Sequence, residues 1–175
     1  MADASLRFLI DADHGQFYVQ DLDPYDAWSA EHAMDPDLPP AGWTDEAVYV
    51  HRIGVEPHSI SVGTARDDMV ESLITVHASE PPTDPAAEHI VETDLDVPTG
   101  QLTVSSPGTD PADGPSLTVP AGLLRARVSY VPAGPPPVGT GGGPGDHFLY
   151  QVDLWPSDRT YGLVIVKQGP EIWAG

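Results

Sequence analysis

The sequence contains no cysteine and only one lysine, Lys167, among its 175 residues. Without cysteine, the protein has no disulfide framework, no thiolate metal site and no cysteine nucleophile. No stretch approaches the roughly 18 apolar residues of a membrane-spanning helix, and the first ten residues lack the apolar run of a signal peptide. We therefore expect a cytoplasmic protein that does not enter a membrane.

Basic residues are scarce as a class. The chain has 27 Asp and Glu residues against 7 Lys and Arg, for a net charge of -20. Residues 1–100 carry 21 of the carboxylates and only 3 arginines. Such a field repels nucleic acid and anionic membranes and attracts basic proteins. Adaptation to a salt-rich cytoplasm, or a coding bias, would explain the same composition, so both explanations stay open.

Proline and glycine are abundant, with 20 and 17 residues. They divide the chain into short segments, several of which alternate between apolar and polar residues as strands do. The clearest runs from Glu88 to Val97. Its apolar residues share one face, and Glu92, Asp94 and Asp96 share the other, which we expect to be exposed and acidic.

The pattern predicts an all-β fold, an antiparallel β-sandwich of about ten short strands with little helix, in a single domain over residues 1–175. The other nine strands are expected at Leu6–Ile10, Gln16–Gln20, Ser59–Thr64, Leu73–His77, Gln101–Ser105, Ser116–Val119, Leu123–Tyr130, Phe148–Leu154 and Gly162–Val166. A short helix is expected within Tyr25–Met34, a hairpin turn at Pro98–Gly100, and a glycine- and proline-rich loop at 132–145.

Tests for chemistry fail at named positions. The Asp11–Gly15 segment starts like a calcium loop, but Gly15, Gln16 and Leu22 occupy the positions that need an oxygen ligand, a glycine and a glutamate. The seven histidines show no metal-binding spacing, and there is no serine nucleophile elbow or phosphate-binding loop. We predict no catalytic residue, metal or cofactor. A glycosidase-type pair of carboxylates, far apart in the sequence and brought together by the fold, stays open.

Trp28 and Trp43 flank an acidic, proline-rich stretch that we expect at the surface. Aromatic side chains anchor protein interfaces and also stack on sugars. We therefore predict partner binding at Trp28 and Trp43, together with the strand residues Glu92, Asp94 and Asp96. The alternative is a small-molecule or carbohydrate site beside these aromatics.

A series of short motifs, in this order, resembles the competence protein ComJ-like family over about residues 10–157. The motifs are His14–Val19, Gly42–Ala47, Ser61–Arg66, Glu88–Glu92, Val97–Leu102, Val119–Gly122, Arg125–Val128, Asp146–His147 and Leu154–Pro156. The named member of that family is regarded as an inhibitor of a DNA-entry nuclease.

The resemblance implies a non-enzymatic inhibitor or immunity-like protein that masks a basic partner such as a nuclease. An acidic surface suits the basic cleft in which a nuclease holds phosphates. Three hypotheses are therefore ranked: inhibitor first, small-molecule or carbohydrate-binding module second, enzyme on a β scaffold third. The sequence leaves the oligomeric state open.

Overall fold

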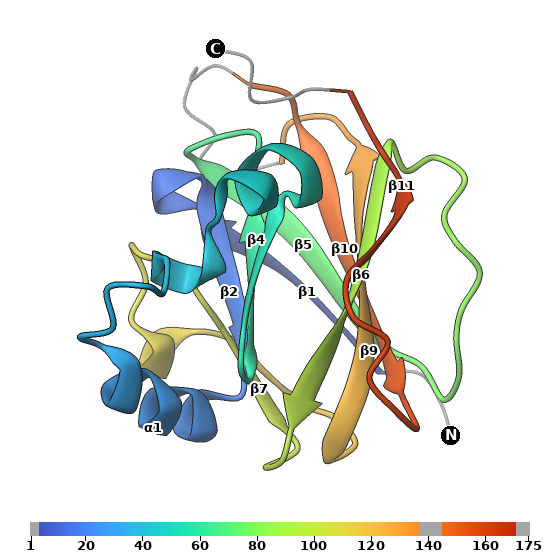
Figure 1. Ribbon diagram of the computed structural model, residues 1–175. Helices are drawn as coiled ribbons and strands as arrows, with labels where there is room; N and C mark the ends of the chain where they lie inside the picture. The colour runs from blue at the N-terminus through green and yellow to red at the C-terminus, as the bar shows by residue number, and fades with distance from the viewer. Residues whose placement is uncertain (1–3, 137–144, 171–175) are drawn as a thin grey trace.

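A computed structural model describes residues 4–136 and 145–170, and shows two β-sheets packed face to face (Figure 1). Sheet A has six strands in the order β1-β5-β10-β9-β6-β11. Their bounds are β1 Ala4–Asp11, β5 Met69–Val76, β6 His89–Val97, β9 Gly122–Pro132, β10 Phe148–Pro156 and β11 Val164–Lys167.

Sheet B has five strands in the order β3-β4-β2-β7-β8. Their bounds are β2 Gln16–Gln20, β3 Ile53–Glu56, β4 Ser59–Gly63, β7 Gln101–Ser105 and β8 Ser116–Thr118. Helix α1 (Leu22–His32) and the segment after it cover the outer side of this sheet (Figure 1). Short helical turns lie at Asp13–Gly15, Pro40–Gly42, Ala47–His51 and Pro111–Asp113.

All ten expected strands are present, and the all-β sandwich is confirmed. One further strand, β3, was not expected, because its four residues contain a glycine and show no clear alternation. The prediction of a purely antiparallel sandwich is wrong, since β10 pairs with β5 in parallel. Side-chain alternation reports which face is buried and carries no information on the direction of the neighbouring strand.

The tight turn expected at Pro98–Gly100 is present, with the backbone N–H of Gly100 donating to the carbonyl oxygen of Val97 at 3.1 Å, but it does not join a hairpin. It carries the chain from β6 in sheet A to β7 in sheet B, so the two strands are not paired. The turn is held by buried Asp21, whose carboxylate accepts hydrogen bonds from the backbone N–H and the hydroxyl of Thr99 at 2.9 and 2.7 Å. This contact ties the start of α1 to the end of the sandwich.

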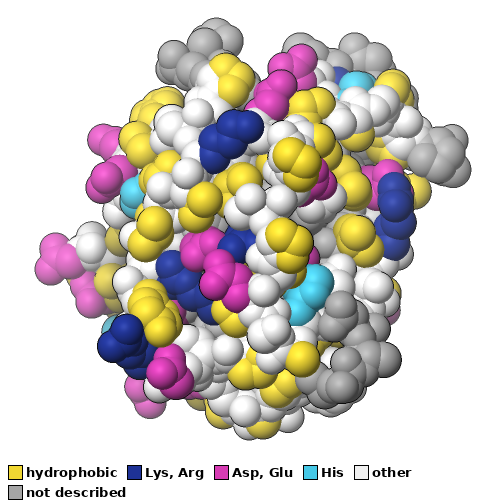
Figure 2. All heavy atoms as spheres, turned by 90° about the vertical axis from the view of Figure 1, so that its right-hand side faces the viewer, with side chains coloured by type: hydrophobic (Ala, Val, Ile, Leu, Met, Phe, Trp, Pro, Cys, Tyr) yellow, Lys and Arg dark blue, Asp and Glu magenta, His cyan; other side chains and the backbone are white. Residues whose placement is uncertain are grey.

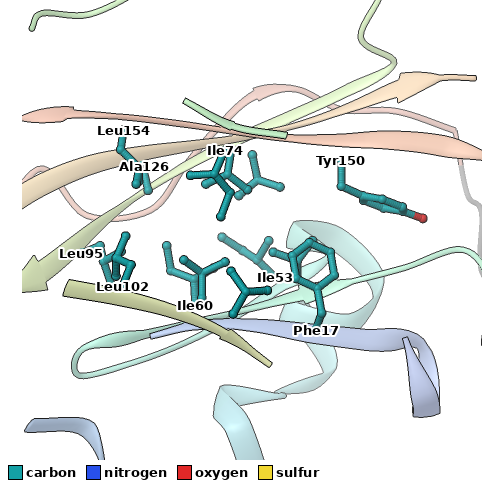
Figure 3. Packing of buried hydrophobic residues seen from close by; sticks show 14 of the residues in the cluster. Phe17, Ile53, Ile60, Ile74, Leu95, Leu102, Ala126, Tyr150 and Leu154 are labelled. Atoms are coloured by element: carbon teal, nitrogen blue, oxygen red, sulfur yellow. The ribbon is translucent and has the colours of Figure 1, made fainter. Parts of the chain in front are cut away.

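The core is one cluster of apolar side chains between the sheets. Figure 3 shows Ile74, Ala126 and Tyr150 of sheet A pointing toward Phe17 and Ile60 of sheet B. The inward faces are the apolar halves of the strand alternation, so burial of these side chains supplies the main driving force for pairing the sheets.

A polar junction closes one end of this core. His89 of β6 is fully buried, with Nε2 2.8 Å from the carbonyl oxygen of His51 and Nδ1 3.2 Å from the backbone nitrogen of Gly169. Nδ1 therefore accepts from an N–H group while Nε2–H donates, an arrangement that only the neutral ring provides. Buried Arg52 beside it donates to the carbonyl oxygens of Gly169 and Pro170.

The expected loop at 132–145 is only partly described. The backbone N–H of Ala133 donates to the carbonyl oxygen of His147 at 3.0 Å and closes its base. Residues 137–144 lie outside the described residues. No helix within residues 4–136 and 145–170 has the length and apolar character to cross a membrane.

We predict that His89 makes the fold sensitive to mild acid. Burial lowers the pKa of His89 from 6.5 to about 4. Between about pH 6.5 and 4, His89 is protonated in the unfolded chain but not in the folded chain. The free energy of unfolding therefore falls as the pH falls through this range. Urea unfolding across this range should show that slope, and His89→Phe should flatten it.

The matched control is His14→Asn, because the His14 side chain is exposed and asparagine tolerates the positive φ at that position. That variant should keep the slope of the parent protein. An unchanged slope in His89→Phe would show that other groups cause the acid sensitivity.

Candidate functional site

The carboxylates expected to be exposed on β6 are largely neutralised by arginines of the same sheet. The Glu92 carboxylate lies 2.8 Å from Nε of Arg127 and 3.5 Å from Nε of Arg125, and Asp94 lies 3.0 Å from Nη1 of Arg125. Both arginines project from the neighbouring strand β9, where Glu92 pairs with Arg127 and Asp94 with Arg125. The expected exposure of Glu92 and Asp94 is wrong, because these cross-strand arginines and the segments above them cover both carboxylates.

The network is capped by two segments of the chain. Arg127 also donates to Glu80 at 2.8 Å and to the carbonyl oxygen of Pro81 at 2.7 Å, and its guanidinium lies 4.9 Å from the Trp155 ring. Burial opposes ionisation of Asp94, but backbone N–H groups of Tyr161 and Gly162, followed by Arg125, outweigh it and lower the pKa of Asp94.

A hollow of about 520 Å³ lies beside this network, lined by residues that include Glu80, Arg125, Trp155 and Tyr161. Figure 2 shows the side of the molecule on which β11 lies, with acidic and basic side chains meeting near its centre. Opposite charges are thus mixed on this side.

Asp96 is the one member of the predicted strand set that stays exposed, with half of its side chain accessible. Its carboxylate lies 3.8 Å from Nδ1 of His58. Alternation placed Asp96 correctly because it lies near the end of β6, beyond the reach of Arg125 and Arg127.

Trp28 lies elsewhere, on α1 over the outer side of sheet B. Its ring stacks on His32 at a centroid distance of 4.8 Å and is tilted against Tyr25 at 6.0 Å. These aromatic side chains line a hollow of about 220 Å³ with Pro40 and Glu56, which we name the Trp28 hollow. The expected helix is therefore present and presents its tryptophan to a surface depression.

Trp43 lines a second depression of about 300 Å³, with His14, Gln16 and Val48. Its indole N–H donates to the side chain of Gln16 at 2.7 Å, which fixes the ring on the outer face of β2. Gly54 allows this placement: a Cβ there would lie 2.3 Å from the carbonyl oxygen of Ala41. The segment before Trp43 thus packs directly on the backbone of β3.

Exposed carboxylates lie in the same stretch of the chain as the two tryptophans. We call them the acidic face: Asp23, Asp26, Glu31, Asp35, Asp37, Asp45 and Glu46. Within the described residues, which include every Lys and Arg of the chain, none of these carboxylates pairs with a Lys or Arg. The sequence from 8 to 51 contains no Lys or Arg at all. This side of the molecule therefore keeps its negative charge.

Sequence reasoning did not single out Tyr25, His32 or Glu56. The first two could have been found, because they lie three residues before and four after Trp28 and so share its helix face. Glu56 comes from a distant strand and shows no local signal. The Tyr25 hydroxyl donates to it at 3.1 Å, and burial followed by the Glu56 charge raises the pKa of Tyr25 to about 12.

The five predicted site residues thus fall into separate places. Trp28 and Trp43 lie on the outer side of sheet B, whereas Glu92, Asp94 and Asp96 belong to β6 of sheet A. Among residues 4–136 and 145–170, no three His, Asp or Glu side chains gather in a way that could hold a metal ion.

The architecture defines a class: a two-sheet sandwich whose outer layer on one side is acidic and aromatic. No protein-family model matches the chain, and no curated protein matches its sequence. Solved structures do match. The crystal structure of ComJ from Bacillus subtilis, described as an inhibitor of the DNA-degrading activity of NucA, superimposes with a TM-score of 0.63 at 19% identity. The match covers 90% of this chain and 100% of ComJ.

A second structure, described as crocagin biosynthetic gene J, superimposes with a TM-score of 0.54 at 15% identity, covering 91% of this chain and all of the other. The structural resemblance to ComJ inferred from the ordered motifs is confirmed. At these identities the likeness establishes the shared fold.

We predict that the buried ion network stabilises the fold through Arg127. Replacing Arg127 with Met leaves the partly buried Glu92 carboxylate without its 2.8 Å partner, with only Arg125 Nε at 3.5 Å. Losing one member of a buried pair costs about 3–5 kcal/mol, so the free energy of unfolding in urea should fall by about that amount. Arg7→Met, which breaks an exposed pair with Glu71, should cost less than about 1 kcal/mol.

Equal, small losses in the two variants would contradict a structural role for the network. They would show that the Glu92 carboxylate is solvated and free to meet a partner.

Proposed function

We propose that the protein binds and masks a basic protein, a nuclease being the foremost candidate, through its acidic face. The observation that carries this proposal is a set of seven exposed carboxylates with no Lys or Arg partner among the described residues, in the chain segment that also supplies Trp28 and Trp43 to two hollows. The function is inhibition by occupation of the partner, without catalysis.

Physical complementarity supports this function. A nuclease gathers cationic side chains in its cleft because it must hold a polyanion. Carboxylates of the acidic face, which have no Lys or Arg partner among the described residues, would accelerate the encounter, and Trp28 and Trp43 would supply desolvated contact area. The neutralised network around Glu92 and Asp94 offers much less net charge, so the interface belongs on the sheet B side.

The structural neighbour supports the same function, since ComJ is described as a nuclease inhibitor rather than an enzyme. At 19% identity no contact residue of ComJ can be transferred to this chain. The cytoplasmic location expected from the sequence is part of the proposal.

A small-molecule or carbohydrate site is the alternative. Such sites usually occupy roughly 300–1,000 Å³. The depressions at Trp28 and Trp43 measure about 220 and 300 Å³, at or below the lower end of that range. They fit single side chains of a protein partner better than a whole ligand.

The function can be tested by capture and inhibition together. Protein immobilised on resin should retain a basic nuclease from native lysate of the source organism, and raised salt should release it because the contact is electrostatic. Adding the purified protein to that nuclease should then suppress DNA degradation. Capture that ignores salt, or a nuclease whose activity is unaffected, would contradict the proposal.

We predict that the double variant Asp26→Asn/Glu31→Gln binds the captured nuclease more weakly. Exposed charge pairs contribute roughly 0.2–1 kcal/mol each, so the dissociation constant should rise roughly 2- to 30-fold, chiefly through a slower association rate. Surface plasmon resonance at several salt concentrations measures both rates.

The matched control is Glu88→Gln/Asp158→Asn, which removes the same charge from the sheet A side. It should change the dissociation constant much less. Equal weakening by both doubles would mean that net charge alone, with no defined face, governs binding.

A further inference from the structure

Glu56 is the inner carboxylate of the Trp28 hollow. It lies at the end of β3 and is partly buried beneath α1, where it accepts the hydroxyl hydrogen bond from Tyr25 through Oε1. Within the described part of the chain it forms no ion pair. A partly desolvated carboxylate without a cation is energetically unfavourable, and burial accordingly raises the pKa of Glu56.

The walls of the Trp28 hollow are aromatic. Nδ1 of His32 donates to the carbonyl oxygen of Trp28 at 2.8 Å, and the imidazole stacks on the indole with an interplanar angle of 22°. Asp35 also lines the hollow. The hollow therefore favours a planar cation. Glu56 and Asp35 supply negative charge, and the aromatic rings supply flat walls.

We propose that the Trp28 hollow receives one arginine side chain of a basic protein partner, with its guanidinium paired to Glu56 and stacked on the aromatic wall. Arginine fits better than lysine, because the guanidinium is planar, less strongly hydrated and able to donate two parallel hydrogen bonds to a carboxylate. A volume of about 220 Å³ suits a single side chain. This inference rests on the proposed function and names the anchor of that interface.

The hollow can be tested without the natural partner, using an acetylated and amidated hexa-arginine peptide as the probe. Titration into ¹⁵N-labelled protein should shift the Trp28 indole N–H signal. Glu56→Gln should lower the affinity for the peptide about tenfold, because a hydrogen-bonded charge pair is lost. The glutamine carbonyl can still accept from Tyr25, so the hollow itself is retained.

The comparison variant is Glu31→Gln, the same substitution at an exposed site on α1 that does not line the hollow. It should lower the affinity for the peptide only about twofold, because the lost charge is exposed and screened by solvent. Hexa-lysine should bind several-fold more weakly than hexa-arginine. An unmoved Trp28 signal, equal effects of the two variants, or equal affinity for the two peptides would overturn the inference.

These outcomes are separable from those of the proposed function. If the nuclease is inhibited equally by the parent protein and by Glu56→Gln, the function stands and the arginine anchor is wrong. If hexa-arginine binds at Glu56 but no nuclease is inhibited, the anchor stands and the nuclease partner is wrong.

Discussion

The location of seven cationic side chains governs the surface chemistry of this protein. Arg125 and Arg127 of β9 neutralise Glu92 and Asp94 of β6 and bind the segments that cover sheet A. With no Lys or Arg between residues 8 and 51, the outer layer of sheet B stays uncompensated. The sheet A side therefore carries mixed charge, whereas the sheet B side carries uncompensated negative charge.

Much of the fold could be predicted, because burial in a sandwich alternates along each strand and the sequence records that alternation locally. The ten strand segments were found in this way, whereas the helix was expected within Tyr25–Met34 from a separate local pattern and begins three residues earlier, at Leu22. The parallel β5–β10 pair, the short β3 and the crossing at Pro98–Gly100 could not be found, since they depend on contacts between residues far apart in the sequence. A turn motif fixes a local chain reversal and does not say which sheet follows.

The structural surroundings of the predicted site residues could be read from the sequence only in part, for related reasons. Alternation assigned Glu92 and Asp94 to the correct face but did not show that this face is covered. The partners Arg125 and Arg127 also share one face of their own strand, yet the register that joins the two sets appears only in three dimensions. Trp28 carried a usable signal through its helix neighbours, whereas Glu56 reaches the same hollow from β3.

The central claim is that partners bind the sheet B side, and mapping the bound surface tests it most directly. Hydrogen–deuterium exchange of the protein, free and with its captured nuclease, reports which backbone amides become protected. An acidic binding face predicts protection concentrated in residues 22–56, covering α1, the segment after it and β3. Protection confined to residues 155–167, beside the neutralised arginine network, would contradict it.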